Sequence, residues 1–367
     1  MLSQLNGATS NSVWKTVRTP QWNIVRNWNR KPLPVMQAVL PWSGLEATVC
    51  PSNDLVARSQ FDGKMNAGIG LINCEGEGAL VRSFEEQPHR SPHHSTNAGP
   101  VNLLALSPDG KHLAAESHLF NINDAQDNAG LQYLGLVIYD VASGRQIARQ
   151  NAVEGNFADF AWSPDSRELA AITSDGWVFV LQAATGKVRL KFRAHQLFGA
   201  QIAWSPDGQT LVTATNARGA LSPTQLEYDI PFHGILTLSH VKQSLTSQDI
   251  RLVTDKNGDA TWNGRTERLL KRFDARTGTQ IGSAVPLQTG AVDLQFSPDG
   301  SQIALGEHEF ALILNAQTLQ TQRRLDIPKP AIPTSTSVPA PVCLAWSDDG
   351  ATLATSTSRG LTLWRVR

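Results

Sequence analysis

The chain has 367 residues, 41% hydrophobic and 17% charged, enough for two or three ordinary domains or one large one. Its 32 basic and 32 acidic residues give a formal net charge of zero, so composition predicts no nucleic-acid partner and no binding to an anionic membrane. No apolar run approaches about 18 residues, so we expect no membrane insertion.

The first 45 residues are predicted to lie outside the repeated part of the chain. This segment is polar, is interrupted by Pro20 and lacks the charged start and apolar core of a secretory signal. Two short β-type runs, residues 13–17 and 22–26, are candidate strands. The three cysteines are an odd number without a disulfide framework, which indicates a reducing compartment, and we expect a cytoplasmic protein.

From residue 46 onward, alternating apolar runs end six times at a tight four-residue corner. The copies are Cys50-Pro51-Ser52-Asn53, Ser107-Pro108-Asp109-Gly110, Ser163-Pro164-Asp165-Ser166, Ser205-Pro206-Asp207-Gly208, Ser297-Pro298-Asp299-Gly300 and Ser347-Asp348-Asp349-Gly350. Pro presets φ, Asp caps the turn and Gly accepts positive φ, so each corner joins two antiparallel strands. Their repetition predicts that the Asp residues make turns and are not catalytic.

One face of the strand before each corner is apolar in every copy. Two residues before the proline site stand Val49, Leu106, Trp162, Trp204, Phe296 and Trp346. This period of two is typical of a half-buried strand, and it assigns these aromatic residues to the core.

Further β-type runs follow the corners and predict four antiparallel strands per repeat. Third runs such as 136–140 and 177–181 lead through Ala-Ser-Gly or Ala-Thr-Gly to a short fourth run. Such units are the blades of a β-propeller. The spacing predicts six blades over residues 46–367, or seven if the long interval before Pro298 holds two; we interpret residues 217–266 within it as an insertion.

These repeats resemble the WD-repeat β-propeller family over nearly all of the chain from about residue 46. The segments that carry the resemblance are residues 100–110, the third run with its turn at 138–144, and Ser174-Asp175-Gly176. Ala194-His195 stands where the family usually has Gly-His, and Trp364-Arg365 replaces Trp-Asp. TolB-like bacterial propellers share the corner.

The resemblance also implies how the ring closes. The last repeat ends at its third strand, residues 361–366, which leaves a sheet edge to be covered. In the resembling proteins an N-terminal strand supplies the missing fourth strand, and residues 13–17 or 22–26 are expected to do so here.

Two segments contain residue types that bind metal ions. Asp255, Asn257 and Asp259 begin a calcium-type loop, but Ala260 and Thr266 stand where such a loop requires Gly and Glu, which favours a turn. His89, His93 and His94 lie in a Ser-Pro-His loop without further ligand spacing. We therefore expect no metal and no cofactor.

The sequence contains no Gly-x-Ser-x-Gly, phosphate-binding Gly-rich loop or His-Glu-x-x-His motif. The hypothesis is therefore a noncatalytic scaffold or assembly subunit that binds proteins through its loops and the insertion, where Tyr228, Phe232 and Trp262 are candidate anchors. The alternative is an enzyme or small-ligand binder at the central channel, with His195, Asp175 and Arg359 as the first candidates.

Overall fold

A computed structural model of the chain describes residues 13–17, 24–27, 47–50, 55–61, 67–73, 80–85, 96–98, 103–121, 131–150, 157–196, 199–215, 252–254, 260–262, 268–328, 342–357 and 360–366. Every regular element within these residues is a β-strand, and all of the strand pairings are antiparallel. The predicted all-β class is confirmed.

Six sheets follow one another along the chain. The first consists of β3 (Ala47–Cys50), β4 (Leu55–Phe61), β5 (Ala67–Asn73) and β6 (Leu80–Glu85), in that spatial order. The second has the order β11 (Gln146–Gln150), β10 (Leu131–Asp140), β9 (His112–Asn121) and β7 (Thr96–Ala98), and β8 (Leu104–Leu106) pairs with the other end of β9.

The third and fourth sheets also have four strands each. The third consists of β12 (Phe157–Trp162), β13 (Glu168–Thr173), β14 (Trp177–Gln182) and β15 (Val188–Arg193). The fourth consists of β16 (Gly199–Trp204), β17 (Thr210–Thr215), β20 (Leu269–Asp274) and β21 (Val285–Pro286). Between β17 and β20 lies a hairpin of β18 (Leu252–Thr254) and β19 (Ala260–Trp262).

The fifth and sixth sheets complete the series. The fifth consists of β22 (Asp293–Phe296), β23 (Gln302–Gly306), β24 (Phe310–Asn315) and β25 (Thr321–Asp326). The sixth has three strands, β26 (Cys343–Trp346), β27 (Thr352–Thr357) and β28 (Gly360–Arg365).

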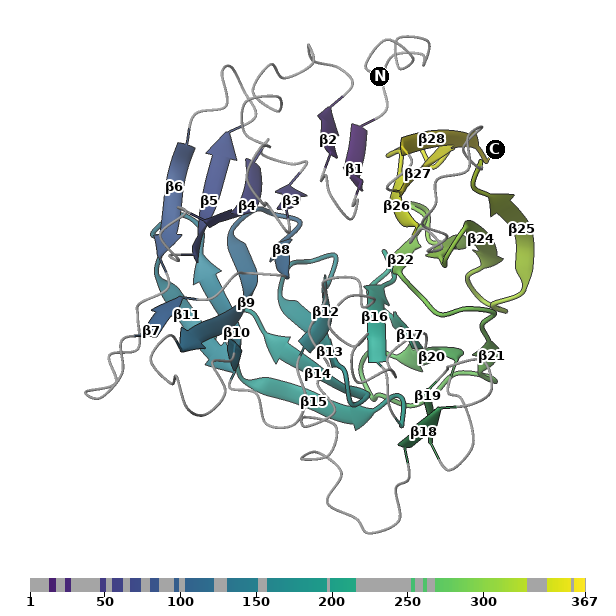
Figure 1. Cartoon of the computed structure of the whole chain (residues 1–367), viewed down its shortest axis with the longest axis horizontal. Coiled ribbons are helices and arrows are strands. Elements are labelled where there is room, and N and C mark those ends of the chain that lie inside the picture. The colour runs from purple at the N-terminus through teal and green to yellow at the C-terminus, as the bar shows by residue number, and fades with distance from the viewer. Residues whose placement is uncertain are drawn as a thin grey trace.

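The sheets are arranged around a common centre with their first strands innermost (Figure 1). The first strands of successive sheets, β3, β8, β12, β16, β22 and β26, contact one another in this order. Several four-stranded antiparallel sheets in this arrangement are what propeller blades require.

The apolar core lies between neighbouring sheets. One cluster joins Leu103 and Leu136 of the second sheet to Phe157, Trp162 and Leu169 of the third. The predicted burial of the residue before each corner is confirmed for Leu106, Trp162 and Trp346, whereas Trp204 and Phe296 are half-buried against neighbouring clusters.

The N-terminal strands take a different place from the one we expected. β1 (Val13–Val17) pairs with β2 (Ile24–Asn27), and β1 contacts β26, β27 and β3. Within the described residues β28 pairs with β27 alone. The two N-terminal strands satisfy their backbone hydrogen bonds with each other, so β1 lies beside the inner strand of the last sheet and not at its outer edge.

None of the described elements is a helix long and apolar enough to cross a membrane.

Among the described residues Trp346 is the largest fully buried side chain, 1% exposed in the cluster between the fifth and sixth sheets. We expect Trp346→Ala to lower the free energy of unfolding by about 3–5 kcal/mol because it leaves a large cavity. Val188→Ala, at a side chain 40% exposed on β15, should stay within about 0.5 kcal/mol of the parent. Urea denaturation of both variants measures this, and equal losses would contradict the assignment of Trp346 to the core.

Candidate interaction surface

The five corners that the structure describes share one hydrogen-bond circuit. In the first of these, the Ser107 hydroxyl donates to Asp109 Oδ1 (2.7 Å) and accepts from the main-chain N–H of His112 (2.9 Å). The same two bonds recur at Ser163, Ser205, Ser297 and Ser347. Each corner therefore has its conformation and strand register fixed by its own side chains.

The last residue of each corner has positive φ, as predicted. Gly110, Gly208, Gly300 and Gly350 supply it without strain, and Ser166 adopts φ 63° in the third sheet. The Ser166 hydroxyl accepts a hydrogen bond from the main-chain N–H of Asp109 (3.0 Å), so a corner of one sheet is tied to the corner of the sheet before it.

The turns between third and fourth strands are fixed in a similar way. Asp274 accepts hydrogen bonds from the main-chain N–H and the hydroxyl of Thr277 (2.7 and 2.8 Å), and Asn315 accepts both groups of Thr318. Because strands alternate in direction, these turns and the corners lie at the same end of the sheets. We call this end the corner face.

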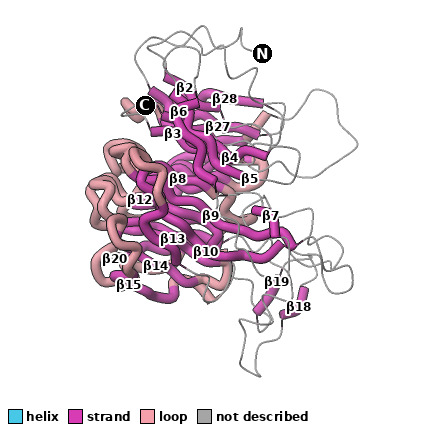
Figure 2. The backbone as a smooth tube through the Cα atoms, turned by 90° about the vertical axis from the view of Figure 1, so that its left-hand side faces the viewer, coloured by secondary structure: helices cyan, strands magenta, loops and turns pink. Residues whose placement is uncertain are grey.

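The connections between second and third strands, and those from one sheet to the next, lie at the opposite end, which we call the loop face. Figure 2 shows the described turns of the third and fourth sheets on one side and the β18–β19 hairpin away from them. Thr215, the last residue of β17, and Leu269, the first of β20, lie at the loop face, and a segment of 53 residues separates them in the sequence. The Thr215 hydroxyl accepts from the main-chain N–H of Leu269 (2.8 Å), which closes the root of this segment.

The structure places only part of the predicted binding set. Trp262 is the last residue of β19 and pairs with Leu252. The other candidates fall outside the described residues: Tyr228, Phe232, Arg359 and the calcium candidates Asp255, Asn257 and Asp259. Within the described part of the chain, no group of three or more His, Cys, Asp or Glu side chains is placed to hold a metal ion.

The two channel candidates in the described region are both buried. His195 is 1% exposed, and its Nε2 lies 2.8 Å from the Thr213 hydroxyl of β17. Asp175 is 6% exposed and accepts from the Thr173 hydroxyl. A Cβ at Gly176 would lie 2.2 Å from the His195 carbonyl oxygen, so this glycine permits the close approach of the two segments.

A second polar pair spans the last sheet. The indole N–H of Trp364 on β28 donates to the Thr355 hydroxyl on β27 (2.8 Å). Thr213 and Thr355 occupy the same position after the corners of their sheets. The fourth sheet pairs the threonine at this position with a histidine, and the sixth sheet pairs it with a tryptophan. The polar network is thus distributed over separate sheets.

Sequence reasoning missed two carboxylates that join neighbouring sheets, and we call these the carboxylate latches. Asp159 accepts from the N–H groups of Phe160 (2.9 Å) and of Ile202 in the next sheet (3.0 Å). Asp293 does the same with Leu294 and Leu344, both at 2.8 Å. Each acid stands five residues before the proline of its corner, and an acid recurring at that place in an apolar run was the available signal.

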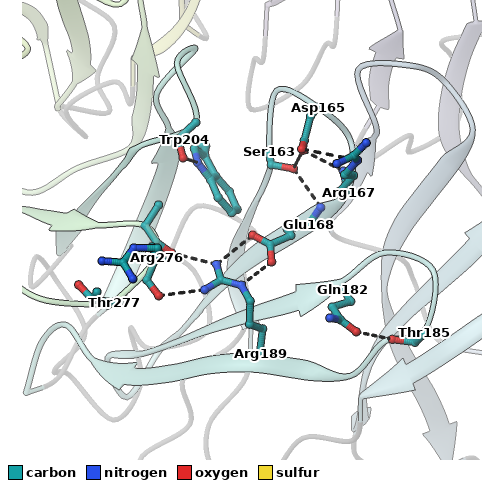
Figure 3. A network of polar contacts seen from close by, with 12 residues as sticks. Ser163, Asp165, Arg167, Glu168, Gln182, Thr185, Arg189, Trp204, Arg276 and Thr277 are labelled. Atoms are coloured by element: carbon teal, nitrogen blue, oxygen red, sulfur yellow. Dashed lines mark hydrogen bonds and ion pairs between the residues drawn. The ribbon is translucent and has the colours of Figure 1, made fainter.

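An arginine bridges the third and fourth sheets near the corner face (Figure 3). Arg189 is the extra residue of a β-bulge, because Val188 pairs with Leu181 and Leu190 pairs with Val180. Its guanidinium forms a two-point ion pair with Glu168, with Nη2 2.9 Å from Oε2. It also donates to the carbonyls of Ala275 (2.9 Å) and Arg276 (3.0 Å).

Glu307, in the turn between β23 and β24, is a fully buried carboxylate that the sequence did not single out. Its Oε2 accepts from the hydroxyl of Thr289 (2.8 Å) and from the N–H groups of Thr289 and Gly290. This acid ties the loop face of the fifth sheet to the connection that leads into it.

Comparison with known proteins agrees with this architecture at low similarity. The chain is 25% identical over 126 residues to protein HIR1 of Kluyveromyces lactis, a WD-repeat protein. The match covers 34% of this chain and 15% of the length of HIR1. No family model matches the chain.

Loss of a carboxylate latch should destabilise the fold. Asp159→Ala leaves the buried N–H of Ile202 without its acceptor, and we expect a loss of at least about 2 kcal/mol in the free energy of unfolding. Asp159→Asn keeps one acceptor oxygen and should lose less. Asp326→Ala, at an exposed carboxylate, is the control and should cost under about 0.5 kcal/mol. Urea denaturation measures these losses. Equal losses of unfolding free energy in Asp159→Ala and Asp326→Ala would contradict the stabilising role of the latch.

The corner carboxylates should make stability depend on pH in the acid range. Hydrogen bonds from Ser163 and Ser205 hold the pKa of Asp165 and of Asp207 below the ordinary value of 3.8. A lowered folded-state pKa contributes stability that is complete above 3.8 and is lost as the pH falls through the folded-state pKa. We therefore expect the double variant Ser163→Ala with Ser205→Ala to lose less stability than the parent as the pH falls from 5 to 2. Thermal unfolding of both proteins over this pH range measures the loss, and parallel curves would contradict the prediction.

Proposed function

We propose that residues 46–367 form one WD-type propeller in the cytoplasm, with residues 1–45 supplying its closure and residues 217–266 inserted in the fourth sheet. The support is the ordered contact of the inner strands and the position of β1, which contacts both β26 and β3. On this proposal the β1–β2 hairpin takes a seventh place beside the six sheets. A buried free cysteine, Cys343, agrees with a reducing compartment.

We infer that the chain is a noncatalytic protein–protein interaction scaffold or a subunit of a multiprotein assembly. The observation that carries this is the contrast between the two faces. Turns at the corner face are short and closed by their own side chains, whereas the loop face receives the long segment between β17 and β20. Loops supported by a rigid scaffold are where binding residues concentrate.

The root of that segment is built independently of the segment itself. Leu269 is tied to Thr215, and Thr213 contacts His195, all within or beside the fourth sheet. The segment can therefore be exchanged for a short turn without removing these bonds, and the chain offers the turn Ser174-Asp175-Gly176 of the third sheet as the replacement.

Replacing residues 217–266 with Ser-Asp-Gly should leave the ring folded and abolish capture of the partner. The measurement is affinity capture from the native lysate with the tagged parent and the replacement variant, with bound proteins identified by mass spectrometry. Trp262→Ala provides a point variant of the same segment. A stoichiometric partner retained by the replacement variant would remove the segment from the binding role, and thermal unfolding of both proteins checks the fold.

A further inference from the structure

Within the described parts of the second to sixth sheets, the charged residues separate into two oppositely charged zones. The outer zone contains the third and fourth strands of the second to sixth sheets with the turns that join them, residues 135–150, 177–193, 268–286, 310–326 and 361–366. The inner zone contains the first and second strands with their corners, residues 103–116, 157–176, 199–215, 293–309 and 342–357. In Figure 1 the outer strands β11, β15, β25 and β28 lie at the circumference.

The outer zone contains three acidic residues, Asp140, Asp274 and Asp326, and thirteen basic ones. The basic residues are Arg145, Arg149, Lys187, Arg189, Lys191, Arg193, Arg268, Lys271, Arg272, Arg276, Arg323, Arg324 and Arg365. Nine of these thirteen are exposed and none is buried. The described outer strands of these five sheets therefore carry a net positive charge.

The inner zone has the reverse composition, with two basic residues, Lys111 and Arg167, and thirteen acidic ones. The acidic residues are Asp109, Glu116, Asp159, Asp165, Glu168, Asp175, Asp207, Asp293, Asp299, Glu307, Glu309, Asp348 and Asp349. Several of these acids serve the corners and latches, which explains their place, and Glu168 forms the ion pair with Arg189 of the outer zone.

Many outer cations are held by neutral partners. Arg272 donates to the carbonyl of Ala316 (2.9 Å), and Arg323 donates to the carbonyl of Arg365 (2.8 Å). Lys191 lies over the ring of Trp177, 4.4 Å from its centroid. A carbonyl or an aromatic ring orients a cation without cancelling its charge, so these groups remain able to attract an anion.

We propose that the outer zone binds the phosphate backbone of duplex nucleic acid without reading its sequence. Basic residues occur on the outer strands of all five sheets, which fits a partner whose negative charge is dense and uniform. A duplex has about one charge per 1.7 Å of its axis, whereas a short acidic peptide covers only part of such a surface. The expectation of no nucleic-acid partner followed from net charge alone and did not consider where the charges lie.

The test is fluorescence anisotropy with a labelled mixed-sequence DNA duplex of about 20 base pairs, titrated at several salt concentrations. We expect affinity to fall steeply as salt rises, with a slope of nearly one per phosphate contacted. Arg145→Ala with Lys187→Ala removes two exposed outer charges and should weaken binding by about tenfold and reduce the slope by up to about two. The control, Lys111→Ala with Arg167→Ala, removes the same amount of charge from the inner zone. It should leave both the affinity for the duplex and the salt slope unchanged.

Three results would overturn the proposal: duplex binding that is absent or insensitive to salt, equal losses in the two double variants, or stronger competition per charge by poly-L-glutamate or anionic vesicles than by unlabelled duplex. Thermal unfolding confirms that the variants are folded. If the first outer double variant does not fold, Arg276→Ala with Arg365→Ala removes two other exposed charges of the outer zone and takes its place. The proposal concerns the circumference and does not depend on the role of the loop face.

Discussion

The hydrogen bond from a corner serine to the aspartate two residues later is the interaction on which the rest of the structure depends. The same hydroxyl accepts the N–H five residues after it, so the corner fixes where the second strand begins. A one-residue change in that register would turn every side chain of the second strand to the other face and remove residues such as Leu169 from the core between sheets. Repetition of this local device builds a series of similar sheets from short-range contacts.

The corners are also why much of the fold could be predicted from sequence. Pro, Asp and Gly have strong local preferences, and the period of two before each corner needs no knowledge of the neighbouring sheet. The place of β1 could not be predicted in this way, since its backbone finds a partner in β2 and its neighbours are chosen by packing. The latch of Asp159 was missed for the related reason that its partner, Ile202, belongs to another repeat.

The candidate site was less predictable than the fold. His195 and Asp175 were candidates for an enzyme or small-ligand site at the central channel, yet both are buried and hydrogen-bonded to threonines. Composition misled in another way, because a sum over the whole chain hides a radial separation of charge that appears only when residues are assigned to inner and outer strands. The corner face, the loop face and the circumference are thus three surfaces with different chemistry, each set by its position in the four-stranded unit.

The carboxylate latches also make the boundaries between neighbouring sheets unequal. Asp159 joins the third sheet to the fourth, and Asp293 joins the fifth to the sixth. At the intervening boundary the same place is occupied by Gln201, whose buried Oε1 accepts no hydrogen bond within the described residues. The contact between the fourth and fifth sheets therefore depends on its apolar cluster and on hydrogen bonds such as the one from Arg272 to the carbonyl of Ala316.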